Sequence, residues 1–369
     1  MKIYVIPNYH KSIVQVTSQS IVQKKYIKLL ESKYDVEVLY PKWGDEINKV
    51  IGAKHWRNLD ISGYSNRAVL PYEYIQYLSK CDLKDSIIYT FQNDNAIDLM
   101  AQLYRPPFVF PKIINHFIAG DEYSAKNPKN LKRILGFSLC SVFNSAYSKE
   151  MIESDMKKMG IVPSMFNWGD NDFVTIGIPM EEISKHQATK KHDKFTFIYA
   201  GNSLMNFKKI DRLIEIYEKL YVMGKDFVVK FYLLDKDINN ELLKRPYIEV
   251  NKTLSREDFW EESSKCHAFI STSTGESYGI AYWELCNNNC IGLFENKRWV
   301  NVIGNVDETF KFNSIEEGVS KAILLIDEYE RMNDMFKKWW DKNKDRHSQK
   351  ENDIKYLKII KRFVDNFTI

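Results

Sequence analysis

The sequence lacks most of the features that mark secreted, membrane-spanning or metal-binding proteins. Its five cysteines include no Cys-x-x-Cys pair, so neither a disulfide framework nor a metal site of ordinary ligand spacing is indicated. No apolar run approaches the ~18 residues that a bilayer-spanning helix needs. The apolar stretch within residues 1–8 is too short for a signal peptide. These absences favour a cytoplasmic protein with reduced, core-packed thiols, no bound metal and no transmembrane segment.

Apolar and aromatic residues, by contrast, are abundant. The chain has 369 residues, of which 44% are hydrophobic and 14% aromatic, and this composition excludes disorder over most of its length. At ~100–200 residues per domain, the length corresponds to about two domains. The formal net charge is +4. Residues 331–369 hold 11 Lys and Arg against 6 Asp and Glu, so the basic excess lies in the tail and does not by itself indicate nucleic-acid binding.

Strand and helix patterns alternate along the chain in two series. The first series predicts strands at 2–7, 36–40, 86–90, 112–117 and 139–143, and helices at 17–32, 94–104, 130–135 and 145–159. The second predicts strands at 195–200, 228–233, 267–272 and 290–294, and helices at 209–222, 256–265, 278–288 and 315–329. Strands separated by helices argue for parallel sheets with crossover helices, so each series is expected to form one doubly wound α/β domain.

The domain boundaries follow from where this rhythm breaks. We expect domains at 1–178 and 194–335, joined by a linker at 179–193 and followed by a helical tail at 336–369. The tail carries an apolar stripe that must be buried against another part of the chain. The members of this predicted stripe are Ile354, Leu357, Ile360, Val364 and Phe367. The back of the first domain is the nearest surface for it, so we expect the last helix to cross back there.

The loop after the predicted strand 267–272 is the most informative segment for function. Gly275 allows a tight turn, and Ser277 and Gly279 stand where a helix begins, so free backbone N–H groups and the positive end of the helix dipole would face an anion such as phosphate. Glu276 and Glu284 flank this segment. Carboxylates beside a phosphate cradle suit a ligand that also carries hydroxyl groups, and a nucleotide sugar fits that description.

The same segment resembles a known family. Glu276 and Glu284 have the E-x7-E spacing and the E-[GS]-[FY]-G-[LI]-x3-E texture of retaining glycosyltransferases with the GT-B fold, especially glycosyltransferase family 4. The resemblance implies two Rossmann-like domains that face each other across a cleft, with the acceptor bound by the first and the nucleotide sugar by the second. It also implies that Glu276 contacts the donor sugar, that Glu284 binds the ribose, and that the backbone of Ser277, Tyr278 and Gly279 contacts the diphosphate.

A second match to the family follows the predicted strand 195–200. The family commonly has Gly-Arg, a short loop and a Lys that together neutralise the leaving diphosphate. Here Gly201 is present and Lys208 or Lys209 supplies the lysine, but Asn202 stands where the arginine usually is. The resemblance therefore implies donor binding by these four residues, with catalytic roles for Lys208 and Glu276. Lys297 or Arg298 could replace the missing cation.

The first domain matches the family less well. The glycine-rich loop that the family often carries after its first strand is absent, and Tyr9, His10 and Lys11 stand there instead, as candidates for an acceptor pocket. His116 ends the predicted strand 112–117, as an active-site histidine does in the family, and it is a candidate catalytic residue. A structural role for His116 stays equally open.

The resemblance implies transfer of a hexose from a nucleotide sugar, with UDP the commonest nucleotide, to an acceptor hydroxyl. It implies a metal-independent site and no other cofactor. The acceptor stays open between a saccharide or lipid-linked glycan, the latter reached by peripheral contact with a membrane surface, and hydroxymethylated DNA. DNA is favoured by the basic and aromatic residues at 55–57, at Tyr64 and Arg67, at 126–133 and in the tail. A sugar-nucleotide epimerase or a non-catalytic nucleotide-sugar binder are further alternatives.

Overall fold

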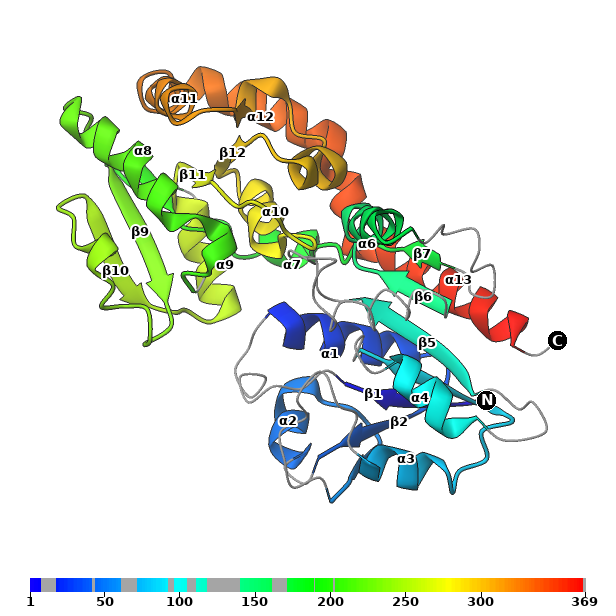
Figure 1. Ribbon diagram of the computed structural model, residues 1–369. Coiled ribbons are helices and arrows are strands. Elements are labelled where there is room, and N and C mark those ends of the chain that lie inside the picture. The colour runs from blue at the N-terminus through cyan, green and yellow to red at the C-terminus, as the bar shows by residue number, and fades with distance from the viewer. Residues whose placement is uncertain are drawn as a thin grey trace. The chain divides into compact units, whose positions relative to one another are not determined.

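The computed structural model describes residues 1–7, 18–41, 44–60, 72–91, 96–104, 111–117, 140–160, 171–188, 190–201 and 203–367. Within these ranges the chain forms two compact units (Figure 1). Unit 1 comprises Met1–Ile176 and Asp353–Ile369, and unit 2 comprises Gly177–Asn352. No helix in the described ranges combines the length and the apolar character that crossing a bilayer requires.

Unit 1 is built on a seven-stranded parallel sheet with the strand order β3-β2-β1-β4-β5-β6-β7. Its strands are β1 (Lys2–Ile6), β2 (Asp35–Tyr40), β3 (Trp56–Asn58), β4 (Ser86–Thr90), β5 (Lys112–Phe117), β6 (Cys140–Phe143) and β7 (Asn171–Phe173). Its helices are α1 (Ser18–Glu31), α2 (Gly44–Ile51), α3 (Tyr72–Leu78), α4 (Ala96–Leu103) and α6 (Ala146–Lys158). The central strands are apolar along their whole length because helices cover both faces of a parallel sheet; every residue of β4, for example, is buried.

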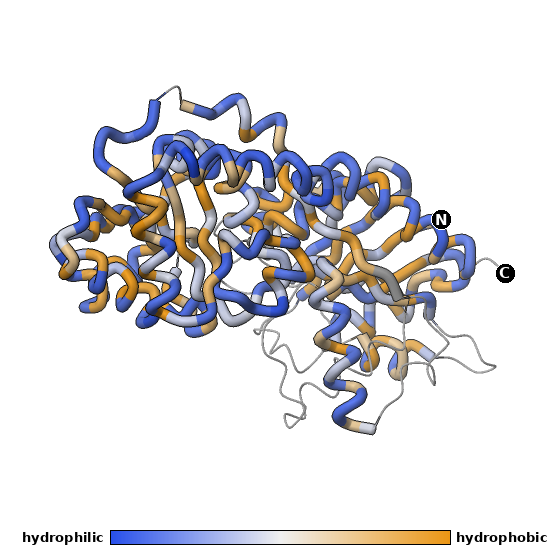
Figure 2. The backbone as a smooth tube through the Cα atoms, turned by 90° about the horizontal axis from the view of Figure 1, so that it is seen from above, coloured by the Kyte–Doolittle hydropathy of each residue, from blue (hydrophilic) through white to orange (hydrophobic). Residues whose placement is uncertain are grey.

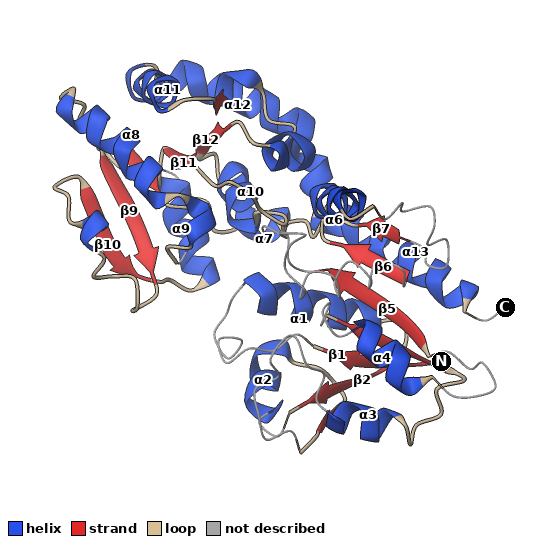
Figure 3. Cartoon of the chain, viewed as in Figure 1, coloured by secondary structure: helices blue, strands red, loops and turns tan. Residues whose placement is uncertain are grey.

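Unit 2 repeats this plan with a six-stranded parallel sheet of order β10-β9-β8-β11-β12-β13. Its strands are β8 (Thr196–Ile198), β9 (Val228–Leu233), β10 (Ile248–Lys252), β11 (Ala268–Ser271), β12 (Ile291–Glu295) and β13 (Lys311–Phe312). Its α-helices are α7 (Met180–Ser184), α8 (Ile210–Val222), α9 (Arg256–Lys265), α10 (Ile280–Asn287), α11 (Ile315–Asp327) and α12 (Tyr329–Asn343). The last helix, α13 (Gln349–Asn366), begins in unit 2 and ends in unit 1. Figure 3 shows the strands of each sheet flanked by helices.

Local sequence signals set several of these helices. Ser145, Ser255 and Ser314 cap α6, α9 and α11, each accepting a hydrogen bond from the backbone N–H three residues further on. Apolar residues gather along the strands in Figure 2, and the helices alternate apolar and hydrophilic residues as expected for one buried face. The sequence did not predict α2, α3, β3, β7, α7, β10 or β13, several of which are short, whereas α12 overlaps the tail that was predicted to be helical.

The C-terminal helix crosses back to the first unit, as the sequence predicts. The Tyr356 hydroxyl donates to the Tyr89 hydroxyl of β4 at 2.9 Å, and its ring lies 4.4 Å from the ring of Tyr26 in α1, centroid to centroid. The predicted stripe is only partly buried, however: Ile360 is fully buried, and Leu357, Val364 and Phe367 are partly exposed. Ile354 is 45% exposed, and the buried face of the helix consists of Tyr356, Ile359, Ile360 and Phe363. The expected tail also divides, because residues 336–352 belong to unit 2.

The chain enters and leaves unit 2 through two segments whose backbones touch. Ile178 forms a parallel bridge with Ser348; its N–H donates to the His347 carbonyl at 2.7 Å, and its carbonyl accepts from the Gln349 N–H at 3.1 Å. Gly177 has a φ of +73°, and a Cβ there would lie 2.6 Å from the Gln349 Cα. Only glycine tolerates both the left-handed backbone and this approach.

We predict that Gly177→Ala destabilises the protein far more than Gly224→Ala. Both glycines have a φ of +73°, but a Cβ at Gly224 would meet nothing within 4 Å. The control substitution therefore costs the strain of the left-handed backbone alone, about 1 kcal/mol, whereas Gly177→Ala adds an overlap with backbone atoms worth about 1–3 kcal/mol more. Urea unfolding of the two variants measures the difference, and equal losses would contradict it.

Candidate functional site

The strand order of unit 2 places a site between β8 and β11. These strands are neighbours, yet the chain runs from β8 to β9 and β10 on one side of β8 and then crosses back to β11 on its other side. At such a switch point the two loops that follow the carboxyl ends diverge and leave room for a ligand. The loops here are residues 199–209 and 272–279, the two segments that the sequence singled out.

Hydrogen bonds fasten these loops to each other. The Thr274 N–H donates to the Phe207 carbonyl at 2.8 Å. The Thr272 hydroxyl lies within 3.0 Å of the carbonyls of both Lys208 and Lys209. Lys209 itself has a φ of 48°, and this left-handed residue ends the short 3-10 helix Asn206–Lys208 and begins α8. The sequence-predicted lysines are therefore held against the second loop by backbone contacts.

The buried ion pair between Lys208 and Glu276 lies at the centre of the site. Lys208 Nζ is 2.6 Å from Glu276 Oε1, and each side chain is only 12% exposed. Lys208 Nζ also donates to the Tyr282 hydroxyl at 3.0 Å and to the Ala200 carbonyl at 3.3 Å. The Ser273 hydroxyl donates to Glu276 Oε1 at 3.2 Å. The structure thus brings the two expected catalytic residues of this unit into direct contact.

The protonation of Lys208 follows from its surroundings. Burial disfavours the ammonium, but the charge of Glu276, with Tyr282 and Tyr199 adding to it, outweighs this cost and raises the pKa of Lys208 above its ordinary value. Lys208 is therefore a permanent cation. An ammonium has three N–H donors, and here all three have acceptors. A phosphate can accept a hydrogen bond from Lys208 only if it displaces one of these three acceptors. The bond to the Ala200 carbonyl is the longest and therefore the weakest, so it is the easiest to displace.

Helix α10 begins at the second loop. Gly279 precedes it with a φ of +75°, and a Cβ there would lie 2.8 Å from the Tyr282 ring. Tyr278 is fully buried, and its carbonyl accepts from Trp283 Nε1 at 2.7 Å. Its side chain is thus part of the core, so only the backbone of Tyr278 can face a ligand, as the resemblance implied. Ser277 is partly exposed.

Glu284 differs from expectation in one respect, because it is already engaged. Arg256, the first residue of α9, donates to Glu284 Oε1 through both Nε, at 3.0 Å, and Nη2. Only 6% of the Glu284 side chain is exposed. The Arg256 guanidinium also lies 4.9 Å from the centre of the Trp260 ring. Arg256 follows β10, so it comes from the same edge of the sheet as Glu276. The sequence analysis missed it because nothing in its local pattern sets it apart from a solvated helix-start arginine.

Lys297, one of the two cations proposed as substitutes at Asn202, has a partner of its own. Lys297 Nζ lies 2.9 Å from Glu295 Oε1, and Arg212 Nη2 lies 3.0 Å from the same oxygen. Glu295 ends β12 and is 5% exposed, so this cluster also lies at the carboxyl edge. Gly201 is placed in the first loop, where its N–H donates to the Tyr199 carbonyl. Asn202, like Tyr9, His10 and Lys11, lies outside the described residues.

His116 is a core residue of unit 1 with no exposed surface. Its Nε2 hydrogen-bonds to Asn144 Oδ1 at 2.9 Å, and its Nδ1 to the Tyr89 hydroxyl. The rings of Tyr26 and Phe91 lie 4.5 and 5.2 Å from the imidazole, centroid to centroid. Burial lowers the pKa of His116 to about 3. These contacts favour the structural interpretation over the catalytic one.

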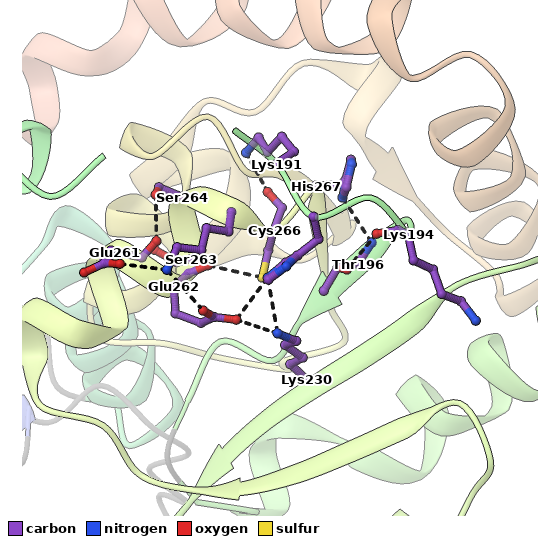
Figure 4. Close-up of polar contacts among 12 residues, drawn as sticks. Lys191, Lys194, Thr196, Lys230, Glu261, Glu262, Ser263, Ser264, Cys266 and His267 are labelled. Carbon is purple, nitrogen blue, oxygen red and sulfur yellow. Dashed lines mark hydrogen bonds and ion pairs between the residues drawn. The ribbon is translucent and has the colours of Figure 1, made fainter. Parts of the chain in front are cut away.

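One cluster of metal-ligand types occurs in the described ranges. Ligand atoms of His192, Glu262 and Cys266 lie within 4.8 Å of one another. The ammonium of Lys230, however, lies 2.7 Å from Glu262 Oε1 and 3.2 Å from His192 Nε2, so a lysine already supplies the positive charge (Figure 4). Glu262 and Cys266 flank the end of α9 that leads into β11, and the cluster therefore lies at the opposite edge of the sheet from Lys208.

Comparisons with known proteins bear on the fold. No family model matches the sequence, and no curated protein matches it. Solved structures do match over nearly the whole chain. One is Anabaena HepE in complex with UDP-glucose, with a TM-score of 0.71, 11% identity, and 98% of this chain and 100% of that chain covered. Another is sucrose-phosphate synthase from Thermosynechococcus elongatus, with a TM-score of 0.71, 9% identity and 99% of both chains covered.

A third match is the lipopolysaccharide outer core galactosyltransferase WaaB in its apo form. Its TM-score is 0.66 at 13% identity, with 98% of this chain and 99% of that chain covered. At such identities the likeness establishes the fold. The expectation of two Rossmann-like doubly wound domains of the GT-B type is confirmed.

We predict that His116 makes the protein sensitive to acid. The native imidazole stays neutral down to about pH 3, whereas the unfolded one binds a proton near its ordinary pKa of 6.5. The unfolded state therefore gains a proton as the pH falls below 6.5, and stability is lost by about 1.4 kcal/mol per pH unit. Urea unfolding at pH 7.5 and 5.0 measures this loss, and His116→Gln should make it shallower by about one proton. An NMR titration of the His116 imidazole with a midpoint near 6.5 would contradict the prediction.

Proposed function

We propose that this protein is a retaining, metal-independent glycosyltransferase that moves a hexose from a nucleoside-diphosphate sugar, most simply a UDP-sugar, to a hydroxyl of a saccharide or lipid-linked glycan. The observation that carries the proposal is the buried Lys208–Glu276 pair at the switch point of unit 2. Support comes from the fold, which the chain shares with the galactosyltransferase WaaB and with HepE, a protein solved in complex with UDP-glucose. The E-x7-E texture, which resembles that of glycosyltransferase family 4, supports the retaining mechanism in this proposal.

The proposed chemistry divides between two kinds of group. Breaking the bond between the anomeric carbon and the phosphate oxygen leaves negative charge on the diphosphate and positive charge on the sugar ring. Lys208 and the backbone N–H groups around Ser277–Gly279 would stabilise the diphosphate; fixed donors of this kind are worth about 3–4 kcal/mol each. Glu276 would accept hydrogen bonds from sugar hydroxyls and so orient the ring. No protein nucleophile is required for transfer on the same face.

Glu284 fits a role in binding the ribose, but in company with Arg256. Because Arg256 occupies Glu284 Oε1 with two N–H groups, the carboxylate is fixed in orientation. A ribose diol would then bind a preorganised carboxylate. An arginine at this position would also add positive charge near the nucleotide, where Asn202 replaces the usual arginine.

The DNA alternative loses one of its supports. Arg57 pairs with Glu37 at 2.9 Å and lies over the Tyr77 ring, so its charge is used inside unit 1. Tyr64, Arg67 and the stretch 126–133 lie outside the described residues, whereas His55, Trp56 and the tail as far as residue 367 lie within them. We therefore place the glycan acceptor first. An epimerase is distinguished from a transferase by its product, as described below.

We predict that Glu276→Gln lowers the rate of sugar transfer about 100-fold or more, the loss expected for one fixed transition-state contact. Glu262→Gln is the matched control. Glu262 pairs with Lys230 at 2.7 Å with both side chains 16% exposed, almost the same setting as the Glu276–Lys208 pair, but at the opposite edge of the sheet. The control should lose stability and keep its turnover. Equal turnover in the two variants would contradict the proposed site.

The assay that decides the activity is incubation with a panel of nucleotide sugars. Release of free nucleoside diphosphate, slow without acceptor and faster with added glycans, supports a transferase. Conversion of the sugar while it stays attached to the nucleotide supports an epimerase. Binding without any turnover supports a non-catalytic binder and overturns the proposed reaction.

A further inference from the structure

The Tyr278 side chain links the proposed donor loop to the segments through which the chain enters and leaves unit 2. Its hydroxyl lies 3.0 Å from Nδ1 of His347, and the Gly177 backbone also hydrogen-bonds to it. Gly177 belongs to the entering segment and His347 to the leaving one. Tyr278 stands between Ser277 and Gly279, whose backbone N–H groups are the proposed diphosphate contacts. A single buried side chain therefore touches all three segments.

The partners of His347 hold it rigidly. Its imidazole is fully buried and stacks on Trp283 of α10, with ring centroids 4.3 Å apart and planes 22° apart. The Trp340 ring of α12 is nearly parallel to it at 5.5 Å. Trp283 in turn donates to the Tyr278 carbonyl. Tyr278 is thus fixed at its carbonyl by Trp283 and at its hydroxyl by His347, and these two partners stack on each other.

The hydrogen bond to Tyr278 satisfies only one nitrogen of the His347 ring. The other nitrogen, Nε2, is buried and has no hydrogen-bond partner within the described residues. An unsatisfied buried polar atom costs about 1–3 kcal/mol, so this histidine is not explained by a gain in stability from hydrogen bonding.

We propose that Tyr278 and His347 are a positioning pair: they fix the donor loop and couple nucleotide binding there to the entering and leaving segments of unit 2. This inference rests on the proposed function. A ligand that restricts the motion of the Ser277–Gly279 backbone also restricts the motion of Tyr278. Through Tyr278 it restricts the motion of Gly177 and His347. Ile178 and Ser348 directly follow these two residues in the chain, so we expect the hydrogen bonds of their bridge to open less often as well.

Tyr278→Phe tests the pair, because it removes only the hydroxyl. The probes are UDP, GDP and ADP, and the measurement is calorimetric binding well below the unfolding temperature. We expect the dissociation constant of the nucleotide that binds to rise about 5- to 10-fold, the size of one ordinary hydrogen bond. Tyr247→Phe is the control. It removes a tyrosine hydroxyl that donates to Glu218 at 2.7 Å at the amino end of β10, and it should leave the affinity unchanged.

A second measurement needs no variant. Hydrogen exchange on the native protein, followed in peptides that cover Ile178 and Gln349, should slow when the nucleotide is added, and the slowing should be reduced in Tyr278→Phe. Unchanged exchange together with equal affinity in wild type and Tyr278→Phe would overturn the positioning pair and leave the proposed function standing. Equal losses of affinity in Tyr278→Phe and Tyr247→Phe would also overturn it. Failure of the wild type to bind any of the three nucleotides would overturn the proposed function, and the pair with it.

Discussion

The adjacency of β8 and β11 is the constraint on which the candidate site depends. Because these parallel strands are neighbours, the loops at their carboxyl ends meet, and Lys208 and Glu276 come together although 68 residues separate them. Removing two charges from water is costly unless each has a partner with good geometry. The pair satisfies this condition only while both loops stay in place. The ion pair thus both requires and reinforces the arrangement of the loops around it.

Pairing of charges extends along the carboxyl edge of unit 2. Glu276 is paired with Lys208, Glu284 with Arg256, and Glu295 with Arg212 and Lys297. Lys208, Arg256, Arg212 and Lys297 thus already have carboxylate partners. Under the proposed function, the phosphates of a ligand would gain hydrogen bonds from these four cations only by replacing carbonyl or carboxylate acceptors. Selectivity then depends on which exchange the ligand can complete, and a ligand with both phosphates and hydroxyls can replace acceptors and supply donors at once.

The sequence predicted the parts of this structure that local patterns encode. Buried parallel strands are continuous apolar runs, so the predicted bounds of most strands lie close to those of the structure. Glu276, Lys208 and Gly279 stand in a spacing that can be recognised in the sequence. Partners could not be predicted in this way. The spacing that singled out Glu284 says nothing of Arg256, 28 residues earlier on another helix. The tail was predicted in part for a related reason: its aliphatic pattern included the buried Ile360, but it did not indicate that the aromatic rings of Tyr356 and Phe363 are buried as well.

Position 278 holds a tyrosine in a fully buried site. Phenylalanine would fill the same apolar site without needing a polar partner, whereas a buried hydroxyl must be satisfied. The chain supplies His347, 69 residues away, and accepts an unsatisfied Nε2 on that ring. A polar contact that adds so little net stability is better explained by specificity of arrangement, because a hydrogen bond fixes direction where apolar packing allows several orientations. The contact lies where the proposed donor loop meets the entering and leaving segments of unit 2. Under the proposed function, the orientation of Tyr278 there sets the direction in which the backbone N–H groups of the loop point.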